Sequence, residues 1–232
     1  QYNQNLNIRA LASNYKIRYV QFSDFRRNVN KKNSVLLNVG GEKIFLKNFL
    51  DKFYLAINYH NAELPKFRGA NSNRFSVFHN KFYTYFSFHY INSKIDKGYV
   101  FYKHKIKLNK KIKYHLHYEL LKAQIASKNI KKIILNALNK KNNKSYFLKK
   151  GNYYPLKYYE NFFHNINTFS FNKIKSYMDV FGGIYYRGNF VTEIKKSKNG
   201  IKLKDCNIKI TKIKFFPLFL YKLFIFLSII KK

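Results

Sequence analysis

The part of the sequence that decides the fold prediction is the stretch LPKFRGANSNRF at positions 64–75. An apolar segment with helix-like spacing precedes it, and a run of aromatic residues typical of a strand follows it. Pro65 restricts the backbone, Gly69 permits close approach, and Arg68 and Arg74 place positive charge beside flat side chains. This combination predicts an RNA-facing corner between a helix and a strand.

Ahead of this corner, apolar residues recur at four-residue spacing from Glu42 to about Ile57, which predicts a helix. A short apolar strand is expected at residues 35–39, ending at Gly40-Gly41. Residues 15–19 alternate between apolar and basic side chains, which is typical of a strand.

Beyond the corner, aromatic residues in near alternation from Arg74 to Ile91 predict one long strand or a hairpin. Residues 99–108 resemble a further strand, and residues 114–138 carry the apolar spacing of a helix. Elements in this order predict an α+β fold, in which an antiparallel sheet carries helices packed on one face.

The charge of the chain indicates a polyanionic partner. Lysine and arginine number 46 against 10 acidic residues, giving a net charge of +36, and a folded surface with that charge repels itself unless a polyanion neutralises it. The lysines are spread along the whole chain rather than gathered beside one apolar anchor, so we expect nucleic acid rather than a membrane. The excess of Asn, Lys, Ile, Tyr and Phe is typical of an A+T-rich, organelle-encoded gene, and we expect a mitochondrial location.

The sequence predicts no enzyme, no metal and no cofactor. The acidic residues are scattered singly, and no pair is placed for acid/base work. His115, His117 and Glu119 lack the spacing and the fourth ligand of a metal site, and Cys206 is alone. Neither a phosphate-binding loop nor a dinucleotide glycine pattern is present.

The C-terminal part, residues 141–232, is expected to be a basic, aromatic-rich extension behind a linker at residues 140–144. It ends in an apolar tail, residues 215–230, that contains Pro217 and Lys222 and is shorter than the about 20 residues of a spanning helix, so burial is favoured. The start of the sequence lacks a signal-peptide pattern, and we expect the given sequence to be a fragment of a longer gene product.

Three motifs carry a resemblance to a known family. They are Ala12–Arg18, Leu37–Ile44, and the set Leu64-Pro65, Phe67-Arg68-Gly69, Phe75 and Asn80. In this order they resemble the large-subunit ribosomal protein L five family over residues 10–90, and the order of elements extends the resemblance to about residue 140. The N-terminal portion of that family has no counterpart here.

The resemblance implies an rRNA-binding domain at residues 1–140, acting as a structural constituent of a mitochondrial large ribosomal subunit in the central protuberance. It implies contacts with large-subunit rRNA, 5S rRNA, neighbouring ribosomal proteins, a small-subunit bridge protein and peptidyl-site tRNA. The expected rRNA-binding residues combine positions carried over from the family with nearby basic side chains: Asn14, Lys16, Arg18, Arg26, Arg27, Lys31, Lys32, Lys66, Arg68, Gly69, Arg74 and Asn80.

Two alternatives remain open. The apolar tail at residues 215–230 would suit a membrane-associated accessory subunit of an organellar respiratory complex. The segment Gly183–Gly188 contains letters that open the GIY-YIG nucleases, although a glycine turn before a strand explains them as well.

Overall fold

The computed structural model describes residues 8–20, 22–27, 31–40, 44–80, 82–109, 111–143, 148, 150–155, 158–161, 169–186, 189–197 and 200–205. The chain divides into two compact units, one of residues 31–211 and one of residues 1–30 with 212–232. In the second unit the described residues form helices α1 (Ile8–Asn14) and α2 (Phe22–Arg27).

The strand predicted at residues 15–19 is absent from this described segment. The backbone turns after α1, where Lys16 N donates to Ser13 O and Ile17 N donates to Ala12 O. Tyr15 and Ile17 are 71% and 64% exposed, so the apolar residues of the alternating pattern do not form a buried face. The prediction was wrong because five alternating residues do not form a strand without a neighbour to pair with.

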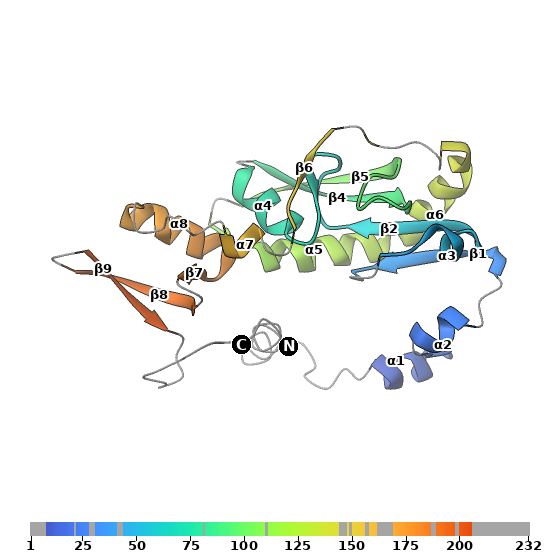
Figure 1. The fold of residues 1–232 in the computed structure, drawn as a ribbon, viewed down its shortest axis with the longest axis horizontal. Helices are drawn as coiled ribbons and strands as arrows, with labels where there is room; N and C mark the ends of the chain where they lie inside the picture. The colour runs from blue at the N-terminus through green and yellow to red at the C-terminus, as the bar shows by residue number, and fades with distance from the viewer. Residues whose placement is uncertain are drawn as a thin grey trace. The chain divides into compact units, whose positions relative to one another are not determined.

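The larger unit is built on a four-stranded sheet (Figure 1) of strands β1 (Lys31–Val39), β2 (Phe53–His60), β4 (Tyr83–Tyr90) and β5 (Val100–Lys107). Their order is β1-β2-β4-β5. β1 and β2 are parallel, whereas β2, β4 and β5 are antiparallel neighbours. The fold is therefore a mixed α/β fold, and the prediction of an antiparallel sheet was wrong at β1, because the connection from β1 crosses over before β2 begins.

The helix predicted over residues 42–57 is also wrong. Only one turn forms, α3 (Lys47–Leu50), before β2 begins. The four-residue spacing is real at its start, since the rings of Phe45 and Phe49 stack 5.4 Å apart. From Phe53 onward the burial alternates instead, with Phe53, Leu55 and Ile57 buried, because β2 pairs with strands on both sides.

The long strand or hairpin predicted between Arg74 and Ile91 is a helix followed by a strand. Helix α4 (Ser72–His79) packs on β4 through a hydrogen bond of 2.9 Å between Ser76 Oγ and Thr84 Oγ1. The other periodic segments are confirmed. Residues 35–39 lie in β1, residues 99–108 contain β5, and residues 114–138 form α5 (His115–Lys128) and α6 (Ile130–Asn139).

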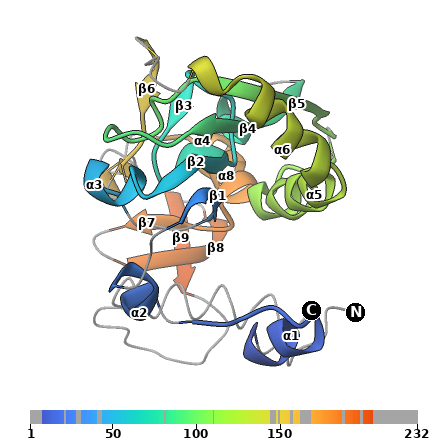
Figure 2. The same ribbon diagram turned by 90° about the vertical axis from the view of Figure 1, so that its right-hand side faces the viewer.

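Helices α5 and α6 cover one face of the sheet (Figure 2). The contact is both apolar and polar, since buried Phe86, Phe88 and Tyr90 lie on this face and Tyr90 Oη donates to Ala137 O at 2.6 Å. Burial of these large rings removes a large apolar area from water between the layers. The opposite face carries a row of polar side chains from three strands.

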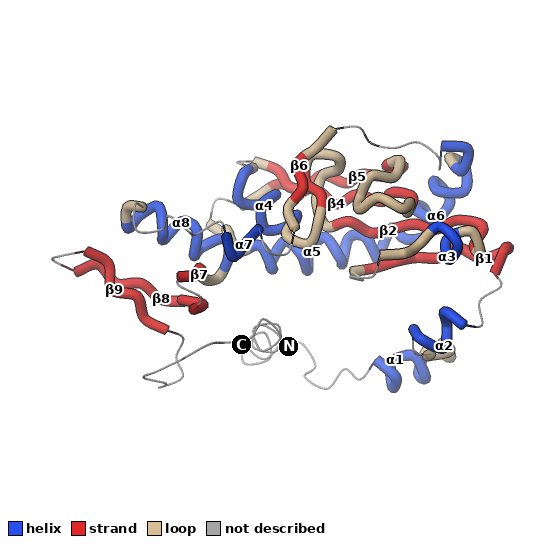
Figure 3. Tube along the Cα trace, viewed as in Figure 1, coloured by secondary structure: helices blue, strands red, loops and turns tan. Residues whose placement is uncertain are grey.

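The chain after residue 140 adds small elements around this core (Figure 3). They are the 3-10 turn η1 (Lys141–Asn143), β6 (Asn152–Tyr153) paired in parallel with β3 (Phe67–Arg68), α7 (Tyr158–Asn161), α8 (Phe171–Phe181), and a sheet of β7 (Ile184–Tyr186), β8 (Asn189–Ser197) and β9 (Gly200–Asp205). Phe75 packs its ring 4.8 Å from that of Tyr154 and 5.4 Å from that of Phe181. The domain boundary after residue 140 stays a prediction.

None of the helices in the described ranges is long and apolar enough to cross a membrane. The predicted apolar tail at residues 215–230 lies outside the described residues.

Candidate active site

A chain of hydrogen bonds crosses three strands on the face opposite α5 and α6. Asn38, Asn58 and His89 lie side by side in register on β1, β2 and β4. Asn38 Nδ2 donates to Asn58 Oδ1 at 2.6 Å, and Asn58 Nδ2 lies 3.1 Å from His89 Nε2. His89 Nδ1 lies 2.8 Å from Tyr90 O. Because a carbonyl oxygen only accepts, this network assigns the proton to His89 Nδ1 and leaves Nε2 as an acceptor.

His60, the last residue of β2, is held in the same way. Its Nε2 lies 2.7 Å from Phe67 O and therefore carries the proton, which leaves Nδ1 without one. Ser87 of β4 stabilises the turn between His60 and Phe67. Its Oγ donates to Ala62 O at 2.8 Å and accepts from Leu64 N at 3.2 Å. The Leu64–Pro65 peptide in this turn is cis.

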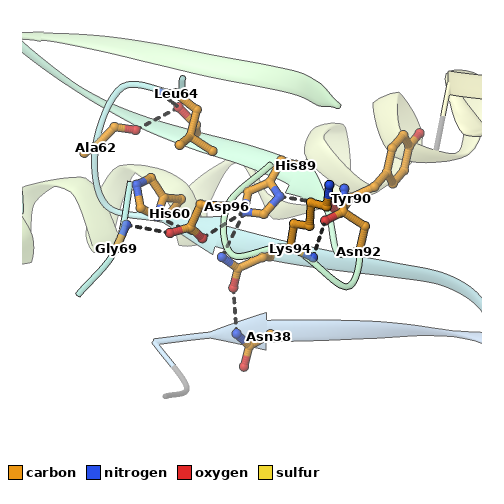
Figure 4. Close-up of polar contacts among 12 residues, drawn as sticks. Asn38, His60, Ala62, Leu64, Gly69, His89, Tyr90, Asn92, Lys94 and Asp96 are labelled. Atoms are coloured by element: carbon orange, nitrogen blue, oxygen red, sulfur yellow. Dashed lines mark hydrogen bonds and ion pairs between the residues drawn. The ribbon is translucent and has the colours of Figure 1, made fainter. Parts of the chain in front are cut away.

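The Asp96 carboxylate lies between the two histidines (Figure 4). Its Oδ1 is 3.5 Å from His60 Nδ1 and 3.5 Å from His89 Nε2, and its Oδ2 accepts from Gly69 N at 2.8 Å. The backbone of Asp96 is left-handed, with φ 51°, a conformation that Asp and Asn adopt more readily than other residues with a side chain. Such backbone conformations cluster at functional sites.

The charges in this cluster are set by burial and by mutual contact. Burial raises the pKa of Asp96, but His60, His89 and the Gly69 N–H outweigh it, so the pKa lies well below its ordinary value. Burial lowers the pKa of His60, although Asp96 opposes that shift. The hydrogen-bond network thus places the Asp96 carboxylate oxygen opposite His60 Nδ1 and His89 Nε2, the two ring nitrogens to which it assigns no proton. The cluster can accept one proton from a bound molecule, because a proton between Asp96 Oδ1 and either ring nitrogen would form a hydrogen bond there.

A buried lysine supports the turn beside His60. Lys122 of α5 is fully buried, and its Nζ donates to Asn61 O at 2.9 Å and to Asn73 Oδ1 at 2.7 Å. Asn73 Nδ2 in turn donates to Glu119 Oε2 at 3.3 Å. Burial lowers the pKa of Lys122 to about 7, although Glu119 opposes the shift. Lys122 therefore connects α5, α4 and the residue next to His60.

Gly98 is the position where a small substitution should disturb the cluster most directly. A Cβ on Gly98 would overlap Tyr90 O, the acceptor of the His89 ring, and would lie 3.2 Å from His89 Nδ1. We expect Gly98→Ala to lower the free energy of unfolding by about 1–3 kcal/mol, measured by urea denaturation, and to reduce the activity of the site.

The matched control for this substitution is Gly40→Ala. No atom lies within 4 Å of a Cβ there, and only the left-handed φ of +71° opposes the change. Gly40→Ala should cost about 1–2 kcal/mol and leave activity intact. Equal activity in the two variants would contradict the role given to Gly98.

Comparison with known proteins decides the family. The sequence model of the formyl transferase family matches residues 9–138, more than half of the chain. The chain belongs to the formyl transferase family. The matched region contains Asn58, His60, His89 and Asp96, so the cluster lies within the formyl transferase domain. No curated protein sequence matches the chain.

Solved structures agree with the family in fold. A 4-N formyltransferase from Francisella tularensis shares 16% identity at a TM-score of 0.56, over 89% of this chain and 83% of that one. A sugar 3N-formyltransferase studied with dTDP and 5-N-formyl-THF shares 18% at 0.56, over 87% and 82%. The methionyl-tRNA formyltransferase from Clostridium thermocellum shares 15% at 0.53, over 88% and 94%.

These findings correct the functional predictions. The resemblance to the ribosomal protein L five family was wrong, and with it the role as a structural constituent of the large ribosomal subunit and the partners rRNA and ribosomal proteins. The alternative of a respiratory-complex subunit is also wrong, as is the prediction that the chain is not an enzyme. The mitochondrial location stays a prediction.

The predicted corner at residues 64–75 does border the site, but its residues have other contacts. Two of its residues contact the cluster through the backbone: Phe67 O accepts from His60 Nε2, and Gly69 N donates to Asp96. Arg68 Nη2 donates to Gly151 O at 2.8 Å, and Arg74 Nε donates to buried His115 at 3.2 Å. Lys66 Nζ donates to Asn80 Oδ1 at 3.2 Å.

The remaining predicted residues lie in other parts of the chain. Asn14 ends α1, Lys16 and Arg18 follow it, Arg26 and Arg27 end α2, and Lys31 and Lys32 begin β1. Except for the last two, these residues belong to the smaller unit. Whether any of the twelve positions binds a ligand stays a prediction.

Sequence reasoning missed Asn58, His60, His89 and Asp96 because it searched for paired acids and for histidines close together in the sequence. The searched residues, His115 and His117, are not part of the site. His115 is buried, its Nδ1 donates to Val180 O at 2.7 Å, and burial followed by Arg74 lowers its pKa to about 3. Within the described ranges no group of three or more His, Cys, Asp and Glu side chains could hold a metal ion. The available signal was a pair of strand ends, Asn58-Tyr59-His60 and His89-Tyr90, followed by Asp96-Lys97-Gly98.

Proposed function

We propose that the protein transfers a formyl group from formyl-tetrahydrofolate to a primary amine. Family membership supports the reaction, and the cluster at Asp96 supports the mechanism. The observation that carries the proposal is that Asp96 Oδ1 lies 3.5 Å from His60 Nδ1 and 3.5 Å from His89 Nε2, the ring nitrogens that the hydrogen-bond network leaves as acceptors.

The reaction forms a bond between the amine nitrogen and the formyl carbon, and the bond from that carbon to the folate nitrogen breaks. The amine must lose one proton, and the folate nitrogen must gain one. Asp96 and His60 Nδ1 can hold the proton between these events, because the carboxylate stabilises an imidazolium beside it. Asn58 Nδ2 has a second hydrogen besides the one donated to His89, and it can stabilise negative charge on the formyl oxygen.

The loop that carries Asp96 also contains an unsatisfied hydrogen-bond donor. Asn92, four residues before Asp96, has a buried Nδ2 that finds no hydrogen-bond acceptor in the described part of the protein. Its Oδ1 already accepts from Lys94 N at 3.0 Å. An unsatisfied buried donor is costly, and a ligand with a carbonyl or ring-nitrogen acceptor would satisfy it.

The acceptor that the charge of the chain favours is an aminoacyl-tRNA. A net charge of +36 suits a polyanionic substrate, and one similar solved structure is a methionyl-tRNA formyltransferase. Other similar structures are sugar N-formyltransferases, so an amino sugar attached to a nucleotide is the second candidate.

A direct assay tests the reaction and the acceptor together. The purified chain is incubated with formyl-tetrahydrofolate and either methionyl-tRNA or a dTDP-linked amino sugar, and formylated product is measured by mass spectrometry. We expect product with methionyl-tRNA. If only the amino sugar gives product, the acceptor is the amino sugar and not the aminoacyl-tRNA. Absence of product with both would refute formyl transfer to these amines.

A further inference from the structure

Strand β5 presents a row of lysines at the edge of the sheet. Lys103, Lys105 and Lys107 are all exposed, and they alternate with less exposed residues that face α5 and α6. In the ladder they lie opposite Ser87, Tyr85 and Tyr83 of β4. Because alternate residues of a strand point to the same face, the three lysines form one line with Cα spacing of about 7 Å. We call these three residues the β5 lysine row.

The β5 lysine row shares a sheet face with the catalytic cluster. Ser87, opposite Lys103, is also opposite His60, and His89 is opposite Asn58. The loop between β4 and β5 carries Asp96 and the exposed Lys94. The row therefore begins close to the cluster in the chain and leads away from it along the same face.

The surroundings of the row are basic and aromatic. Residues 82–109 contain five lysines, and Asp96 is the single acidic residue among them. The three lysines make no ion pair with any acidic side chain in the described ranges. Lys105 Nζ lies 3.7 Å from the ring centroid of Tyr83, which is itself 39% exposed.

Lysines on an edge strand have a second explanation, since they prevent pairing with the strands of other molecules. That role requires positive charge anywhere along the edge. It does not require the lysines to share one face with the active site or to stand beside an exposed aromatic ring. A basic line with aromatic neighbours is the arrangement that follows a nucleic-acid backbone.

We propose that the β5 lysine row binds backbone phosphates of the RNA whose aminoacylated end enters the cluster at His60 and Asp96. The inference rests on the proposed function, in which the amine belongs to an aminoacyl-tRNA. The row would orient the acceptor, while the cluster carries out the transfer.

The test is a triple variant, Lys103→Gln with Lys105→Gln and Lys107→Gln, in the full chain. Its control is a triple variant with the same loss of charge, Lys128→Gln with Lys131→Gln and Lys132→Gln. These control lysines are exposed on α5 and α6, the layer that covers the other face of the sheet. Thermal unfolding confirms that both variants are folded.

Binding of fluorescently labelled methionyl-tRNA is measured by anisotropy from low to high salt. In the row variant we expect the slope of log affinity against log salt to fall by about one for each lost phosphate contact, which is two to three in total. We also expect kcat/KM for methionyl-tRNA to fall, while kcat/KM for methionyl-adenosine, which has no RNA backbone, stays within about twofold.

Equal salt slopes in the row variant, the control variant and the native chain would overturn the proposal and leave the edge-protection role. Loss of RNA binding in the row variant would support the RNA surface even if the native chain formylates neither acceptor. That pair of results would refute the proposed function and leave the RNA-binding surface supported.

Discussion

Asp96→Asn is expected to lower kcat/KM for formyl transfer by about 10²–10⁴-fold, the usual contribution of general acid–base catalysis. The amide has nearly the shape of the carboxylate, and its oxygen can still accept from Gly69 N. Its nitrogen can donate to His60 Nδ1 or His89 Nε2, the two ring nitrogens that face Asp96 at 3.5 Å. Asparagine also tolerates the left-handed backbone at φ 51°. The fold is therefore retained, and the variant loses only the negative charge that holds the transferred proton.

The measurement is steady-state formyl transfer to methionyl-tRNA across pH 5–9, together with thermal unfolding of each protein. Asp51→Asn is the matched control, because Asp51 is an exposed carboxylate that pairs with Lys47 away from the cluster. The control should keep its activity within about twofold, since exposed ion pairs contribute little. Native-like activity in Asp96→Asn would exclude Asp96 as the proton carrier.

The sequence predicts those elements whose pattern is regular over their whole length. The apolar spacing of residues 114–138 persists for several turns, and the structure forms α5 and α6 there. The spacing of Phe45, Phe49 and Phe53 is compatible both with a longer helix and with one helical turn followed by a strand. Residues from Phe53 onward form a strand because β2 pairs with β1 and β4. That outcome depends on residues 20 or more positions away, which no local pattern contains.

The candidate active site is hidden from sequence reasoning for the same reason. Asp96 is a single acid in the sequence, and it acquires its partners only when β2 and β4 pair and bring His60 and His89 together. The corner at residues 64–75 was predicted to face RNA, because Arg68 and Arg74 place positive charge there. In the structure it is the backbone N–H of Gly69 that reaches the carboxylate.

The second large effect concerns the stability of the protein and its dependence on pH. The pKa of Lys122 falls from 10.5 in the unfolded chain to about 7 in the folded protein, because burial penalises the charged amine. Between these values the unfolded chain binds the additional proton, so the free energy of unfolding rises with pH by about 1.4 kcal/mol per unit. Below pH 7 Lys122 is charged in both states, and the full cost of burying the charge remains.

Lys122→Met should abolish this rise, because methionine fills similar space and does not titrate. Urea denaturation at pH 7 and pH 9.5 should show the native chain gaining about 3 kcal/mol relative to the variant. Lys128→Met, an exposed lysine of the same helix, corrects for the general loss of charge repulsion at high pH, and it should parallel the native chain. A parallel rise in Lys122→Met would mean that the amine stays charged in the folded protein, held by Asn61 O, Asn73 and the field of Glu119. The turn beside His60 would then rest on a permanent buried cation, whose removal leaves Asn61 O unsatisfied and destabilises the site at every pH.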